Sequence, residues 1–234
     1  LSTANKLEQL LLPTKASVHK PNLKVQWCFY HVPKTAGSSL RQSFTLALGE
    51  KAVFGVYRNT GASDLAKGSP IWIPRRATVL FGHFPTHTEH TKMFPHAKCV
   101  TWIREPLERV WSLLGHYLAM KEQSPQYLFI KEHYINKGVT KKEAIFERMI
   151  KENTFKNSVN VYSHYFKHIP LTQFDFVGSV TRNSEDVRKL QTYIGSPLKE
   201  TQENVRNSIN SFPTSLRFLE NELASEYEIV GDFL

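Results

Sequence analysis

The chain has 234 residues, of which 41% are hydrophobic and 22% are charged, as in a soluble globular protein and unlike a fibrous or disordered one. A chain of this length buries a core without a metal or a disulfide, and none of its apolar runs approaches the roughly 18 residues of a membrane-spanning helix. The net charge of +9 favours polyanionic partners, such as nucleic acid, anionic lipid, acidic polysaccharide or nucleotide phosphates, without choosing among them.

The first quarter of the chain predicts an arm, a strand and a helix. Residues 1–23 are polar and contain two prolines, and we interpret them as an N-terminal arm. The short apolar run Val25–Tyr30 is typical of a strand buried on both faces of a parallel sheet. Apolar residues at helical spacing predict a helix over Ser38–Leu48. Residues 49–77 show little periodicity, so we expect irregular structure or an excursion from the sheet there.

The rest of the chain alternates between strands and helices. Three further apolar runs predict strands: Thr78–Phe81, Ala97–Ile103 and Phe174–Val180. A helix is expected to begin at Pro106, and others are expected within 126–168, 184–194 and 212–227. This alternation implies an α/β fold with a mainly parallel sheet, in a single domain over residues 1–234.

The loop between the first strand and the first helix is a candidate anion site. Ligands of open α/β sheets bind at the carboxyl ends of strands, where a helix N-terminus offers unpaired N–H groups. Several residues of this loop bind anions or let the backbone approach one: Lys34, Thr35, Ala36, Gly37, Ser38 and Ser39. The loop suits phosphate or sulfate, and the alternative is an ordinary capped turn. It is not a nucleoside-triphosphate loop, because the lysine precedes the glycine.

A second candidate anion site follows the predicted strand Ala97–Ile103. Arg104 stands at the strand end, and Ser112 lies eight residues later, on the same side of the helix start. A guanidinium holds two phosphate oxygens while a hydroxyl takes another. The alternative role for Arg104 is an ion pair with Glu108.

These two motifs, in this order and each at a strand-to-helix junction, resemble those of the PAPS-dependent sulfotransferases. The closest resemblance is to the carbohydrate branch with the heparan and uronyl 2-O-sulfotransferases, and it covers about residues 25–195. It implies a P-loop-like (sulfotransferase) fold, with a central, mainly parallel sheet flanked by helices on both faces. It also implies PAPS as co-substrate, PAP as product and no metal. The first loop would grip the 5′-phosphosulfate and the second motif the 3′-phosphate. The nucleotide-binding residues would be Lys34, Thr35, Ala36, Gly37, Ser38, Ser39, Arg104 and Ser112, with Asn204 and Arg206 near the C-terminus.

The resemblance also implies that His83 is the general base. The dipeptide Gly82-His83 matches the glycine and catalytic histidine of the 2-O-sulfotransferase branch. Sulfuryl transfer requires removal of the acceptor's hydroxyl proton, and a neutral histidine does this well near neutral pH. Lys34 would stabilise charge that develops on the leaving phosphate. His31 and His116 compete with His83 for the role of base.

A metal site is not expected. His83, His87 and His90 share a helical spacing, but Pro85 would break the helix that aligns them. The sequence offers no evident carboxylate or thiolate partner for these histidines.

The expected reaction is therefore transfer of the sulfuryl group of PAPS to a hydroxyl of a carbohydrate, most simply an anionic glycan. One alternative is another nucleotide-phosphate enzyme, such as a divergent kinase. A second is a polyanion-binding protein without catalysis. No motif of nucleic-acid recognition stands out, so nucleic acid is not expected as a partner. A homo-oligomer is compatible with the sequence, which leaves the oligomeric state open.

The cysteine content bears on the compartment. Cys28 and Cys99 lie in apolar runs, where we expect core thiols and no disulfide framework. This favours a bacterial-type cytoplasm. The alternative is the Golgi lumen, with a membrane anchor removed from the chain.

Overall fold

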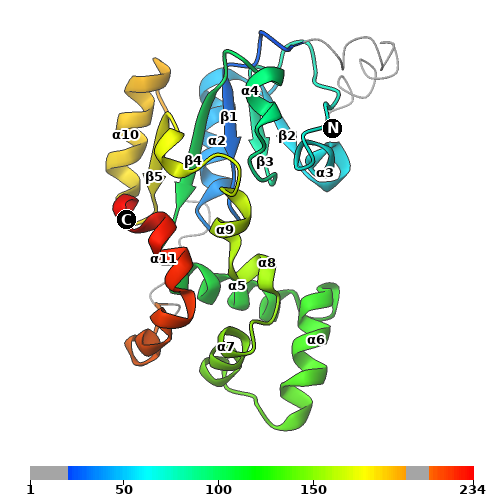
Figure 1. Ribbon diagram of the computed structural model, residues 1–234, viewed down its shortest axis with the longest axis vertical. Helices are drawn as coiled ribbons and strands as arrows, with labels where there is room; N and C mark the ends of the chain where they lie inside the picture. Colours follow the sequence, from blue (N-terminus) through cyan, green and yellow to red (C-terminus); the bar gives the residue numbers. More distant parts are fainter. Residues whose placement is uncertain (1–20, 199–210) are drawn as a thin grey trace.

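Five parallel strands form one sheet in the computed structural model, which describes residues 21–198 and 211–234 (Figure 1). Neighbouring strands follow the order β2-β3-β1-β4-β5, and each pairing is parallel. The strands are β1 (Trp27–Tyr30), β2 (Val53–Val56), β3 (Val79–Gly82), β4 (Lys98–Ile103) and β5 (Phe176–Ser179). The predicted α/β fold with a mainly parallel sheet is confirmed. The observed strands β1, β4 and β5 are shorter than predicted, and β3 is shifted by one residue toward the C-terminus.

The edge strand β2 was not predicted, so the expectation of irregular structure throughout residues 49–77 is wrong. This strand has only four residues and contains Gly55, and a glycine weakens the strand signal of the sequence. A Cβ at position 55 would lie 2.8 Å from Nη2 of Arg41. Glycine at this position therefore lets the Arg41 guanidinium lie close to the strand.

Helices cover both faces of the sheet. On one face, α2 (Gly37–Leu48) and α10 (Asn183–Ile194) pack against a core that includes Phe29 and Trp102. On the other face, α3 (Ala62–Leu65) and the end of α4 (Glu89–Met93) pack against a core that includes Tyr30. Strands covered on both faces explain the nearly continuous apolar runs of the sequence.

A third core lies among helices beyond the carboxyl ends of the strands (Figure 1). It joins α5 (Pro106–Met120), α6 (Pro125–His133), α7 (Lys142–Lys151), α8 (Lys156–Val159) and the 3₁₀ helix η6 (Thr214–Leu223). The single helix expected over 212–227 is in fact η6 followed by α11 (Ala224–Val230). Leu216 and Leu219 are both buried and lie three residues apart, which suits the 3₁₀ period of three.

The remaining described elements are short. They are α9 (Val161–Tyr165), η1 (Arg58–Thr60), η2 (Lys121–Gln123), η3 (Ile135–Lys137), η4 (Leu171–Gln173) and η7 (Gly231–Phe233). Helix α9 packs on α11, and both contribute to a fourth core beside the end of β4. No described helix is both long enough and apolar enough to cross a membrane.

The strand order creates a switch point between β1 and β3. The chain leaves β1 through α2 toward β2, whereas it leaves the adjacent β3 through α4 toward β4 on the other side. These connections run over opposite faces of the sheet. Loops diverge at such a point, and ligands of open α/β sheets bind in the crevice between them.

Candidate active site

The loop between β1 and α2 has an unusual backbone. Lys34 and Ala36 adopt positive φ angles of 74° and 63°, in the left-handed region that favours glycine. Such conformations are unfavourable for residues with a Cβ and persist where surrounding contacts hold them, often at ligand sites. One such contact is internal: Thr35 is fully buried, and its hydroxyl donates a hydrogen bond of 2.8 Å to the carbonyl oxygen of Val32. Thr35 therefore closes the loop.

The start of α2 suits an anion. Ala36 is the N-cap residue, and it has no side-chain oxygen to cap the first turn. The first turn also contains no acidic residue, so no carboxylate opposes the positive end of the helix dipole. Ser38 is exposed and Ser39 half-buried at this helix start. The donor set of this loop fits a phosphate or sulfate group.

His83 immediately follows β3, on the strand next to β1. Its backbone N–H donates to the carbonyl of Val56 at 3.0 Å, and its Nδ1 lies 3.1 Å from the carbonyl oxygen of His31. A carbonyl oxygen only accepts hydrogen bonds, so the geometry assigns the proton to Nδ1 and leaves the lone pair on Nε2. His83 is thereby held in the tautomer that accepts a proton at Nε2.

Burial lowers the pKa of His83, and the hydrogen bond to the His31 carbonyl partly opposes this shift. The net direction is toward the neutral imidazole. Two rings flank it: the ring centroid of His31 lies 4.4 Å away and that of Tyr57 lies 5.1 Å away. His83 is therefore neutral and partly shielded from water at neutral pH, as a general base requires.

Arg41 and Tyr57 complete this edge, and the sequence did not single out either of them. The Arg41 guanidinium carbon lies 5.4 Å from the centroid of the Tyr57 ring. Burial raises the pKa of Tyr57, and Arg41 acts in the opposite direction. Tyr57 was missed because β2 was missed. The position of Arg41, one helical turn after Gly37, was the available signal.

Arg104 follows β4, the strand on the other side of β1. Tyr30 of β1 pairs with Thr101 of β4, so the loop with Lys34 and the turn with Arg104 leave adjacent strand ends. The two predicted motifs therefore follow neighbouring strands at the same edge of the sheet.

Arg104 forms the ion pair with Glu108 that the sequence suggested as an alternative to phosphate binding. Its Nε lies 3.4 Å from Oε2 of Glu108, which is within the range of an ion pair but long for a hydrogen bond. Arg217 approaches the same carboxylate, with Nη2 3.7 Å from Oε1 of Glu108. Ser112 lies further along α5 and is half-buried. The ion pair therefore does not occupy the guanidinium with short, bidentate hydrogen bonds.

Three other residues were candidates for the site in the sequence. Asn204 and Arg206 lie outside the described residues. His116 lies in the second half of α5. Among the described residues, no group of three or more histidine, cysteine, aspartate or glutamate side chains is arranged to hold a metal ion.

His90 is a core histidine. Its Nε2 lies 2.9 Å from the carbonyl of Leu65, and its Nδ1 lies 3.0 Å from the hydroxyl of Tyr30. Burial is the main cause that lowers its pKa to about 4. Both ring nitrogens are therefore used within the core.

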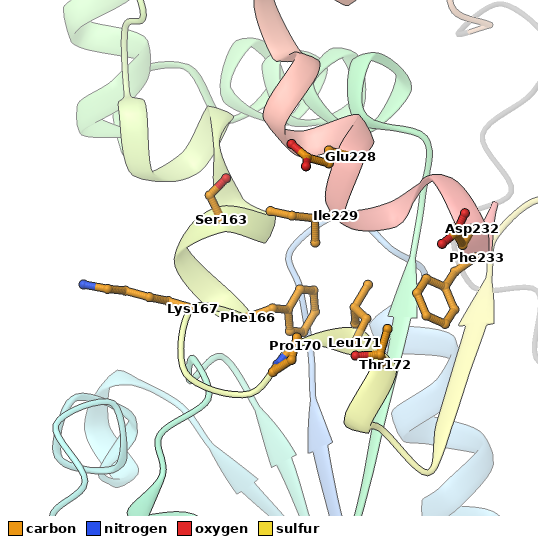
Figure 2. A pocket seen from close by; sticks show the side chains of 10 residues that line it. All are labelled: Ser163, Phe166, Lys167, Pro170, Leu171, Thr172, Glu228, Ile229, Asp232 and Phe233. Carbon is orange, nitrogen blue, oxygen red and sulfur yellow. The ribbon is translucent and has the colours of Figure 1, made fainter.

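Figure 2 shows a hollow of about 250 Å³ elsewhere, between α9, η4, α11 and η7. It is lined by Ser163, Phe166, Lys167, Pro170, Leu171, Thr172, Glu228, Ile229, Asp232 and Phe233. None of these residues belongs to the sequence motifs. The hollow is separate from the loop and His83.

Comparisons with known proteins support the fold. No protein-family model matches the chain, and no curated protein matches it either. Among solved structures, mouse sulfotransferase SULT7A1 complexed with PAP has a TM-score of 0.54 at 11% identity, over 89% of this chain and 85% of its own. A sulfotransferase from Alicyclobacillus acidocaldarius has a TM-score of 0.45 at 16% identity, over 92% and 97%. The likeness to the mouse enzyme, together with the five-stranded parallel sheet and flanking helices, shows that the chain has the fold of a sulfotransferase.

Proposed function

We propose that this protein is a PAPS-dependent sulfotransferase that acts on a hydroxyl of a carbohydrate. The observation that carries the proposal is the position of His83. Its Nδ1 is bonded to the carbonyl of His31, the residue that begins the anion-binding loop. The proposed base and the proposed anion loop therefore lie at the ends of two adjacent strands, as transfer from an activated sulfate to an alcohol requires.

The proposed nucleotide site has two ends. Lys34, the backbone from Thr35 to Gly37, and the hydroxyls of Ser38 and Ser39 would hold the 5′-phosphosulfate. Arg104 and Ser112 would hold the 3′-phosphate, and Asn204 and Arg206 are further proposed contacts. The relative crystallised with PAP supports this choice of nucleotide. PAPS bound here supplies the sulfuryl group, and PAP is the product.

The chain's own residues would handle the proton and the charge. Nε2 of His83 accepts the hydroxyl proton as the acceptor oxygen forms its bond to sulfur. The bond between sulfur and the bridging oxygen breaks, and that oxygen keeps the electron pair. The Lys34 ammonium then stabilises the negative charge on the departing phosphate oxygen. This accounts for one proton, one bond formed and one bond broken.

The proposed acceptor is an anionic glycan in the manner of the 2-O-sulfotransferase branch. The net charge of +9 supports an acidic acceptor, because basic side chains attract uronate or sulfate groups. Arg41 adds a cation near Tyr57 and His31, whose rings flank the proposed base. We further propose a bacterial-type cytoplasm as the compartment.

Transfer of radiolabelled sulfate from PAPS tests the activity directly. The acceptors are a panel of desulfated and sulfated glycosaminoglycans, neutral oligosaccharides and small alcohols. We expect label on at least one glycan with the wild-type chain, and at least a 100-fold loss in Lys34→Ala and His83→Ala. Lys92→Ala is the matched control, since Lys92 is exposed and paired with Glu89 at 2.7 Å. Label on no carbohydrate, or full activity without His83, contradicts the proposal.

Nucleotide preference separates this function from its alternatives. PAP in 100-fold excess over its dissociation constant stabilises the folded state by about 2.7 kcal/mol, which raises the melting temperature. We expect this shift with PAP and not with Mg·ATP. A shift with Mg·ATP alone would favour a kinase. Retention of heparin binding without any sulfate transfer would favour a non-catalytic polyanion-binding protein.

A further inference from the structure

His31 lies between the two halves of the proposed site. It follows β1 directly and is 7% exposed. Its backbone N–H donates to the carbonyl of Gly82 at 2.9 Å, and its own carbonyl accepts from Nδ1 of His83 at 3.1 Å. These two bonds tie the end of β1 to the end of β3 at the switch point.

The imidazole of His31 also touches the start of α2. A Cβ at Gly37 would overlap the His31 ring, with Nε2 as its nearest atom. The His31 ring therefore occupies the space beside Gly37 that a side chain would otherwise need. Its centroid is 5.4 Å from that of Phe81 and 4.4 Å from that of His83.

We propose that His31 is a positioning residue, whose buried ring is wedged between Gly37 and His83 and fixes the anion loop and the base relative to each other. This inference rests on the proposed function. It assigns His31 no contact with the reacting atoms, so His31 is not a second base. Its part is to hold Gly37 at one edge of its ring and to shield one side of His83 from water.

The charges around His31 agree with a neutral wedge. Burial lowers its pKa well below the usual value, and His83, Lys34 and Arg41 act in the same direction. His83 stands at the end of β3, Lys34 lies in the loop and Arg41 lies on α2. Tyr57 faces His83 from the end of β2. Nδ1 of His31 is buried and has no hydrogen-bond partner among the described residues. A proton there would add an unpaired buried charge beside two cations.

Two variants of His31 separate the effect of the ring's shape from the effect of its nitrogens. His31→Phe keeps a flat aromatic ring and removes both nitrogens, whereas His31→Ala removes the ring and keeps the carbonyl that bonds His83. Because Phe is larger than His beside Gly37, His31→Leu is the second variant if His31→Phe does not fold. His96→Ala is the matched control, as His96 is exposed in the turn before β4.

The first readout is spectroscopic and needs no turnover. In ¹⁵N-labelled protein, imidazole shifts report the tautomer and titration of His83. We expect His83 to carry its proton on Nδ1 in the wild type, His31→Phe and His96→Ala. In His31→Ala we expect its pKa to rise, because loss of the ring exposes it to water. An unchanged titration of His83 in His31→Ala would overturn the proposal.

The second readout is kinetic. We expect kcat to fall about tenfold or more in His31→Ala, with the acid limb of the pH profile moved to higher pH. His31→Phe, or His31→Leu in its place, should stay within about threefold of wild type. An equal loss in the ring-preserving variant would overturn the proposal, since a nitrogen would then be required. If the wild type transfers no sulfate, the proposed function fails, while the titration of His83 still tests the wedge.

Discussion

The hydroxyl of Tyr162 makes hydrogen bonds to both the backbone N–H and the backbone carbonyl of Arg104. It donates to the Arg104 carbonyl at 2.6 Å and accepts from the Arg104 N–H at 2.9 Å. Tyr162 is itself fixed, because its own N–H donates to the buried carboxylate of Glu226 at 2.8 Å. Arg109 adds a guanidinium 5.6 Å from the Tyr162 ring. Helices α9 and α11 thereby set the position of a residue at the end of β4.

The first prediction follows from this clamp. Tyr162→Phe removes both hydrogen bonds and leaves two backbone groups of Arg104 unpaired, which should lower the free energy of unfolding by about 1–3 kcal/mol. If Arg104 holds the 3′-phosphate, affinity for PAP should also fall, by about fivefold or more. Titration calorimetry with PAP and urea denaturation measure the two effects.

Tyr134→Phe is the control for this clamp. The Tyr134 hydroxyl also makes two hydrogen bonds, to Glu152 at 2.9 Å and Thr154 at 2.6 Å, but within the helical region. It should lower stability and leave PAP affinity unchanged. Equal PAP affinity in Tyr162→Phe and wild type would show that the clamp does not act on nucleotide binding.

The second prediction concerns the strained loop. Ala36 has a positive φ, so Ala36→Gly should raise the free energy of unfolding by about 0.5–1 kcal/mol. Ala47→Gly, within the same helix α2, should instead lower it by about 1 kcal/mol. Urea denaturation compares the two. A loss of stability in Ala36→Gly equal to that in Ala47→Gly would mean that the backbone at position 36 is not strained.

The third prediction concerns pH and activity. His83 acts as a base only when neutral, and its pKa is lowered by burial. The ratio kcat/KM should therefore stay high at a pH of about 6.5, the usual pKa of histidine, and should fall only at a lower pH. A profile of kcat/KM between pH 4.5 and 8 measures this. An acid limb above pH 7 would be incompatible with His83 as the base.

The fourth prediction concerns pH and stability through His90. Its Nε2–H donates to Leu65, so protonation must add a hydrogen at Nδ1, which faces the hydroxyl of Tyr30 and the N–H of His87. The folded state thus binds the proton less well than the unfolded state, and stability is full above about pH 6.5. It should fall by roughly 3 kcal/mol as the pH falls toward the folded pKa of about 4.

Urea denaturation at several pH values measures this loss. His90→Gln keeps a donor for the Leu65 carbonyl but does not titrate, so its stability should depend less on pH. His96→Ala, which changes an exposed histidine, should keep the wild-type dependence. The same dependence in His90→Gln and wild type would assign the acid sensitivity to other groups.

The fifth prediction is a coupling between Gly37 and His31. Gly37→Ala places a methyl group against the His31 ring and should lower both stability and PAP affinity. In a His31→Ala background the same change should cost less, because the ring is absent. A double-mutant cycle should give a coupling of about 0.5–3 kcal/mol. Additive effects would mean that the two side chains do not interact.

Much of the fold was predictable because the strands are covered on both faces. Cys28 and Phe29 face opposite cores, and such strands appear in the sequence as nearly continuous apolar runs. The edge strand β2 pairs only with β3 and contains Gly55, so its sequence lacks this signal.

The candidate site was predictable only where it follows a motif. Lys34, His83 and Arg104 each follow a predicted strand. Because these strands are parallel, all three residues lie at the same edge of the sheet. Tyr162 lies 58 residues from Arg104 along the chain, and no local pattern links the two. Its role depends on how the helices pack against the sheet, which periodicity does not specify.

The separate core of α5 to α8 affects how the protein unfolds locally. Its buried residues are distinct from those on either face of the sheet. Segments with their own packing often unfold as independent cooperative units, which amide hydrogen exchange detects. Arg104, one of the proposed 3′-phosphate contacts, stands between β4 and α5, at the boundary of two such units, and Ser112 lies within α5. A nucleotide that joins both would merge them, and exchange in α5 would slow even at amides that the ligand does not touch.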